Sequence, residues 1–237
     1  MENLPFYIPV VFGLTVLLTL FLFYRATNKS GSALLLIIGW LILQSILSLQ
    51  GFYTVTNTRP PRLPLMILFP FALIVFLFFT KKGRSFIDSL DPARLTLLHV
   101  IRVPVELVLW GLSVYKAVPL LMTFEGRNFD ILSGLTAPLI FYWGYVQKRI
   151  PRQILLLWNF ITLGLLVNIL INGVLSAQSP FQQFAFDQPN RAILYFPFSL
   201  LPAGLVPLVL FSQLATIRVL LKTNTRHEHT RYGVDSI

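Results

Sequence analysis

The segment LLHVIRVPVELVLWGLSVYK, residues 97–116, places ionisable side chains inside a stretch that is otherwise apolar enough to cross a membrane. On a helix that advances about 100° per residue, His99, Arg102, Glu106 and Trp110 project within roughly 80° of one another. A charged group at bilayer depth is costly unless it faces the interior of a bundle and finds a partner there. The pattern therefore predicts a helix whose polar side faces other helices or a water-filled cavity.

The rest of the chain is also too apolar for a soluble domain of 237 residues, because 55% of the residues are hydrophobic and only 12% are charged. The mean hydropathy is +0.73, and apolar runs of about twenty residues match the ~30 Å hydrocarbon thickness of a bilayer. We therefore expect an all-α polytopic membrane protein that forms a single bundle. Its seven expected transmembrane helices cover residues 5–24, 33–52, 63–80, 97–116, 131–146, 154–175 and 194–221.

The net charge of +10 is explained by membrane topology rather than by a nucleic-acid partner. If the N-terminus lies outside, thirteen of the nineteen lysines and arginines fall in cytoplasmic segments. Cytoplasmic loops carry such an excess of basic residues, so the distribution predicts an N-out, C-in protein. We expect a multi-pass protein of the bacterial cytoplasmic membrane, with membrane lipids as partners. Outside, only four basic residues remain: Arg59, Arg62, Arg127 and Arg191.

Two absences narrow the chemistry further. The sequence contains no cysteine, which removes disulfides, thiolate metal sites and cysteine nucleophiles. The N-terminus, MENLPFYIP, lacks the basic start of a cleavable signal peptide, and the first apolar run is long enough to remain as a membrane anchor. We expect no metal site, because one intramembrane histidine and one carboxylate fall short of the ligands that zinc requires. No cofactor is expected either.

Two parts of the chain repeat each other. LILQSILSLQ at 41–50 aligns with ILINGVLSAQ at 169–178, which pairs Gln44 with Asn172. Downstream, both copies pass through a Pro/Arg element, RPPR or QPNR, into a helix that bears Phe-Pro-Phe. The offset between the copies stays between 127 and 129 residues. The match predicts an internal duplication in which two three-helix units have the same orientation.

The duplication divides the bundle into three plus one plus three helices. Parallel repeats of this kind are a recurring construction of transporters, with the site near the midplane between the halves. The topology, span count and length resemble those of the SWEET sugar carriers and of the vitamin carriers built on the same plan. No Pro-Gln pair stands at the position that defines the PQ-loop group, and the linker helix here is the most polar one, whereas in those carriers it is peripheral. The expected units are 1–84, the linker helix 85–121, the second repeat 122–221 and a cytoplasmic tail 222–237.

The linker helix offers the first candidate site. Glu106 lies near mid-membrane and is suited to carry a proton or to bind a cation. In the alternative interpretation the polar side is structural: Arg102 and Glu106 neutralise each other at i,i+4, and His99 donates to a carbonyl.

The amides and the outer arginines offer two further sets. Gln44, Asn168 and Asn172 are expected to hold a polar substrate by hydrogen bonds together with Arg102, Glu106 and Trp110, or else to act as interhelical hydrogen-bond partners. At the outer mouth, the arginines are expected to attract an anionic solute or headgroup, or simply to reach the lipid phosphates. These arginines are Arg62, Arg127 and Arg191.

The sequence leaves three functions open. We expect a membrane carrier for a small polar or anionic metabolite, proton-coupled through Glu106. The first alternative is an intramembrane enzyme that acts on a lipid or lipid-linked substrate with His99 and Glu106 as acid and base. The second is a non-catalytic membrane sensor or complex subunit. A homo-oligomer is compatible with each.

Overall fold

The computed structural model describes residues 4–56, 58 and 60–232, and for residues 223–232 it gives the course of the helix alone. Within these ranges the regular secondary structure is helical, apart from a single β-bridge between Ala177 and Asn190. Five helices are long and apolar enough to cross a membrane, so this is a helical integral membrane protein. They are α1 (Tyr7–Ala26), α2 (Gly31–Leu49), the combined helix Pro92–Val114, α8 (Arg152–Ser176) and the segment Leu201–Lys222.

The remaining two expected spans are less regular. The helix α3 (Leu63–Phe79) is bent by 91° against α4 (Lys81–Asp88), and the two provide a sixth crossing only if they are taken together. The helix α7 (Ile131–Ile140) continues into the π-helical turn η4 (Phe141–Val146), and both together are shorter than a usual span. The prediction of seven full-length spans is therefore met only in part.

The expected linker helix is built from three pieces: α5 (Pro92–Leu98), the 3-10 turn η2 (His99–Ile101) and α6 (Arg102–Val114). Asp91 caps its start and Pro92 follows at the first position, and the Asp91 carboxylate accepts from the backbone N–H groups of Ala93 and Arg94. Pro104 has no N–H to donate to the preceding turn, and the helix narrows to a 3-10 turn just before it.

This combined helix is central in the bundle. It packs against α1, α7 and α9 (Val206–Tyr232), and α9 follows directly on the π-helical turn η6 (Leu201–Leu205). With Leu201–Lys222 it is one of the two most buried of the five long helices. Short 3-10 turns connect the remaining parts: η1 (Phe52–Thr54), η3 (Leu120–Met122) and η5 (Ala192–Leu194).

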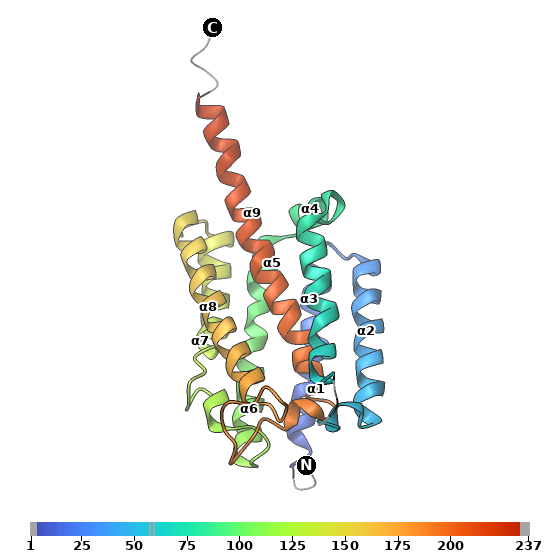
Figure 1. Ribbon diagram of the computed structural model, residues 1–237. Coiled ribbons are helices and arrows are strands. Elements are labelled where there is room, and N and C mark those ends of the chain that lie inside the picture. Colours follow the sequence, from blue (N-terminus) through green and yellow to red (C-terminus); the bar gives the residue numbers. More distant parts are fainter. Residues whose placement is uncertain (1–3, 57, 59, 233–237) are drawn as a thin grey trace.

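The two ends of the bundle differ (Figure 1). The start of α1 lies at one end, whereas α4, the link between α1 and α2, and the projecting part of α9 lie at the other. Contacts join the elements of this second end: the backbone N–H of Asp91 donates to the carbonyl of Ala26 at 3.1 Å. The Asp88 carboxylate of α4 binds Arg218 at 2.9 Å and Lys222 at 2.6 Å, both on α9.

The internal repeat is not evident in local structure. In the first copy, Pro70 of the Phe-Pro-Phe element lies inside α3. In the second copy the element covers residues 196–198 and precedes the helix that starts at Leu201. The duplication therefore stays a prediction from the sequence.

Candidate functional site

The guanidinium of Arg102 lies at the centre of the bundle, where only 3% of the residue is exposed. Its Nη1 forms an ion pair with Oδ1 of Asp130 at 2.5 Å and also donates to the backbone carbonyl of Thr162 at 3.2 Å. Its Nη2 donates to Oε1 of Gln213 at 2.7 Å. Three other helical regions thus supply partners to one buried cation, as burial of a charge requires. The expected neutralisation of Arg102 by Glu106 is not the pairing that the structure contains.

Close packing of α7 brings Asp130 to Arg102. An added Cβ on Gly134 would lie 2.8 Å from the backbone nitrogen of Val103, so α7 approaches the start of α6 more closely than a side chain permits. Asp130 precedes Gly134 by about one helical turn and therefore faces the same helix. Its Oδ1 also accepts from the hydroxyl of Ser133 at 3.3 Å.

Gln213 on α9 extends the network toward α8. Its Nε2 donates to the backbone carbonyl of Asn159 at 2.7 Å and to the hydroxyl of Thr162. Because its oxygen faces Arg102 and its nitrogen faces α8, both ends of the amide have partners. Gln213 thereby links α6, α8 and α9 through a single side chain.

Glu106 lies one turn beyond Arg102 and is 2% exposed. Its Oε1 accepts from the side-chain amide of Asn128, which also donates to the carbonyl of Met122 at 3.0 Å. The second oxygen, Oε2, is buried and has no hydrogen-bond partner. A buried carboxylate oxygen without a partner is unfavourable, so this atom is suited to a proton or a ligand.

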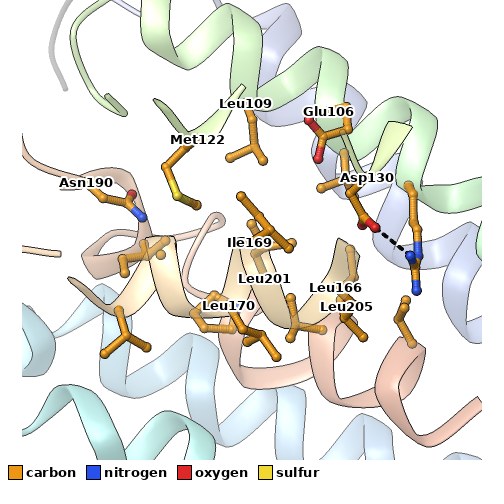
Figure 2. A pocket seen from close by; sticks show the side chains of 18 of the residues that line it. Glu106, Leu109, Met122, Asp130, Leu166, Ile169, Leu170, Asn190, Leu201 and Leu205 are labelled. Carbon is orange, nitrogen blue, oxygen red and sulfur yellow. Dashed lines mark hydrogen bonds and ion pairs between the residues drawn. The ribbon is translucent and has the colours of Figure 1, made fainter. Parts of the chain in front are cut away.

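A cavity of about 80 Å³ lies beside this carboxylate. Its charged lining residues are Arg102, Glu106 and Asp130, and most of the others are aliphatic side chains from α3, α6, α8 and the start of α9. A water molecule needs roughly 10–15 Å³ of such space, so the cavity has room for a few waters or a small solute. Figure 2 shows Glu106 and Asp130 near one end of the cavity and Asn190 near the other, with leucines and Ile169 between them.

Asn190 is a further lining residue of this cavity that the sequence patterns do not indicate. It is fully buried, yet neither its amide oxygen nor its amide nitrogen has a hydrogen-bond partner. Its backbone is held in place, because its N–H donates to the carbonyl of Ser176 at 2.8 Å. An amide with both atoms unpaired at the wall of a cavity is a second group suited to a ligand.

The other two expected residues on the polar side of the combined helix do not line the cavity. His99 is buried, as expected, but neither ring nitrogen has a hydrogen-bond partner, and the ring packs edge-on against Trp158 at 5.8 Å between centroids. It does not line the cavity. Trp110 is 39% exposed and stacks on Phe124 at 6.3 Å, away from the cavity lining.

The expected amide set does not gather at the cavity. Gln44 is buried and accepts from the hydroxyl of Tyr53 at 2.6 Å. Asn172 donates to Asn168 on the same helix, and Asn168 donates to the backbone carbonyl of Arg127 at 2.8 Å. These bonds serve local structure and loop attachment.

The outer arginines likewise lie away from the cavity lining. Arg62 covers the ring of Phe52 at 4.5 Å and donates to the carbonyl of the same residue. Arg127 and Arg191 are exposed.

The sequence contains a signal for one of the residues that were missed. Gln213 is an amide inside an apolar span, which by itself marks a candidate for an interhelical hydrogen bond. Asn128 and Asp130 stand in a loop in the sequence, and nothing local indicates that the loop turns into the bundle. In the described part of the chain, no cluster of three or more His, Cys, Asp or Glu side chains is placed to hold a metal ion.

Comparison of the chain with protein-family models, with curated proteins and with solved structures finds no match.

Proposed function

We propose that the protein is a membrane carrier for a small solute, in which the cavity beside Arg102 is the binding site and Glu106 binds a proton or a cationic group. The observation that carries this proposal is the lining of one cavity by two buried groups with unpartnered polar atoms, Oε2 of the Glu106 carboxylate and both atoms of the Asn190 amide. A structural network alone explains the partners of Arg102, but it leaves these two groups without a role.

The charges of the site narrow the class of solute. Asp130 already neutralises Arg102, so an ionised Glu106 leaves one net negative charge at the cavity. This balance favours a neutral or cationic solute over the anionic metabolites that the outer arginines suggested. The aliphatic wall between Glu106 and Asn190 favours a solute with an apolar body and a polar group at each end.

A shared carboxylate also provides a mechanism of coupling. One carboxylate oxygen cannot bind a proton and a cationic group of the solute at the same time. Exchange of one for the other at Glu106 would link solute movement to proton movement in the opposite direction. A transport cycle also needs places where helices can bend. The two π-helical turns, η4 after α7 and η6 before α9, are suited to this role.

The topology that fits this proposal has seven crossings, with the N-terminus outside and the C-terminus in the cytoplasm of a bacterial cell. This topology is supported by the positions of lysine and arginine. These residues are in excess in the segments at one end of the bundle, where α4 and the projecting part of α9 lie. The internal repeat remains part of this proposal as an evolutionary explanation of the two halves.

The alternative of an enzyme with His99 and Glu106 as acid and base is less well supported. Glu106 lines the cavity, whereas His99 does not. The two groups therefore do not meet around one substrate-sized space.

A thermal-shift screen tests the carrier proposal. The detergent-purified protein is screened against amines, amino acids, sugars, vitamins, organic anions and lipids, and a bound solute raises the unfolding temperature. We expect stabilisation by a small amine or neutral amphipathic solute, and a smaller stabilisation in Glu106→Gln and in Asn190→Leu. The control is Asn168→Ala, an amide outside the cavity, which should bind as the wild type does.

Uptake into proteoliposomes then tests the coupling. We expect Glu106→Gln to abolish uptake driven by a pH gradient and to leave solute exchange partly intact. The carrier proposal is wrong if Glu106→Gln and Asn190→Leu both match the wild type in binding and uptake. Stabilisation by a lipid alone, if it is lost in Glu106→Gln, would instead direct work to the enzyme alternative.

A further inference from the structure

A second and larger cavity lies on the other side of α9. It is a groove of about 360 Å³ between α2, α3 and the start of α9, and apolar side chains form nearly all of its wall. Trp40 joins α2 to the rest of the bundle at this groove. Its indole N–H donates to the carbonyl of Ala203 at 2.8 Å, and its ring stacks on Phe69 at 4.4 Å. Because the groove lies between apolar helices of a membrane protein, its natural occupant is a hydrocarbon chain.

One end of the groove is close to several cations. Ser30, Ser32 and Phe86 line this end, and the neighbouring segments carry exposed lysine and arginine side chains. None of these side chains has an ion-pair partner within the described ranges. The four cations are Lys29, Lys81, Lys82 and Arg84.

The cations of α4 lie on a helix that is bent sharply against the end of α3. The two helices meet at 91°, and the bend depends on Gly83, because a Cβ there would collide with the backbone of Leu77. The sole acidic residue of α4, Asp88, is bound to Arg218 and Lys222. The positive charge of Lys81, Lys82 and Arg84 is therefore not neutralised by their own helix.

We propose that this groove binds one anionic phospholipid, with an acyl chain between α2 and α3 and the phosphate at the cations of α4 and Lys29. Basic residues on an interfacial helix attract anionic headgroups, and a fitted apolar groove fixes the chain beside them. The site is separate from the proposed solute cavity, and it does not depend on what that cavity transports.

Native mass spectrometry of the full chain tests this site. The protein is purified in mild detergent and mixed with equal amounts of phosphatidylglycerol and phosphatidylcholine that carry the same acyl chains. We expect one bound lipid, with a preference for phosphatidylglycerol of about tenfold, since several cations each contribute. The triple variant K81Q/K82Q/R84Q should lose this preference.

Two further variants separate the headgroup from the groove. The control K148Q/R149Q removes two exposed cations from the loop between η4 and α8 and should keep the wild-type preference. Ala33→Trp places an indole in the groove and should remove the bound lipid while all the cations remain.

The proposal is overturned if the wild type binds both lipids equally, a result that needs no variant. It also fails if the triple variant and the control lose the preference alike, or if Ala33→Trp retains the lipid. Thermal unfolding of each variant in detergent identifies any that is misfolded.

Discussion

Around Arg102, four helical regions converge on one guanidinium, and both of its Nη atoms have partners. Beside α2, the helices stand apart, and a groove remains that is more than four times as large as the central cavity. Both regions belong to one bundle and share α9. The difference lies in their chemistry, since the first contains ions and amides and the second contains almost only apolar side chains.

The comparison shows where packing in this protein is specified. Lipid tails are as apolar as leucine, so burial of apolar surface does not by itself draw α2 against α3 and α9. An unpaired guanidinium in the same environment is costly, so Arg102 strongly favours a close approach of the helices that carry its partners. Lipid can therefore take the place of protein at the groove, but not at the polar centre.

The largest expected effect follows from removal of the central cation. Arg102→Met leaves Asp130 buried without its ion pair, and we expect the free energy of unfolding to fall by about 3–5 kcal/mol. Chemical unfolding in detergent measures the loss. The double variant R102M/D130N should recover much of it, because both charges are then absent. If the single variant is as stable as the wild type, the polar centre does not determine the packing.

Glycine-to-alanine substitutions compare how tightly the polar centre and the groove are packed. In Gly134→Ala the new Cβ meets the backbone of Val103, and we expect a loss of about 1–3 kcal/mol. In Gly204→Ala at the groove the Cβ meets the flexible end of Leu41, which can move, so the loss should be smaller. Gly164→Ala, with open space around it, should be neutral or stabilising. Equal losses at Gly134 and Gly204 would mean that the groove is packed as tightly as the centre.

The smallest expected effect concerns the ion pairs that anchor α4 beside the groove. Partial burial raises the pKa of Asp88, but the hydrogen bonds and charges of Arg218 and Lys222 outweigh burial and lower it below the usual 3.8. A carboxylate with a lowered pKa stabilises the folded state above its ordinary pKa, and this contribution is lost as the pH falls from about 4 through the folded pKa.

Unfolding temperatures measured between about pH 6 and about pH 3 test this assignment. The unfolding temperature of the wild type should fall slightly more over this pH range than that of Asp88→Asn, because the variant lacks the ionised carboxylate at every pH. A wild type and a variant that differ equally at every pH would contradict the assignment.

Local sequence patterns predicted some of these features and not others. The spacing of His99, Arg102 and Glu106 predicted their burial on one side of a helix, because helical periodicity is a local property. The partners of Arg102 were not predictable in this way, since Asp130 and Gln213 lie 28 and 111 residues further along the chain. Their approach depends on the packing of α7 and α9, which no short motif encodes.

Local sequence patterns also misplace Asn190 and Trp110. They place Asn190 outside the site, where it belongs inside, and Trp110 inside the site, where it belongs outside. Asn190 stands in a polar loop in the sequence, yet it is buried at the cavity because a backbone hydrogen bond attaches that loop to the end of α8. Trp110 follows the helical spacing of the polar side, but it lies beyond the converging helices and stacks on a loop residue instead.

The position of Gln213 has a consequence for biosynthesis. A chain emerges from the ribosome N-terminus first, so α6 enters the membrane long before α9 is made. Until then, Nη2 of Arg102 lacks its amide partner, and the carbonyl of Asn159 and the hydroxyl of Thr162 lack their donor. Assembly of the centre is therefore complete only when α9 docks, and in a chain that stalls before Gln213 the Nη2 atom of Arg102 has no amide partner.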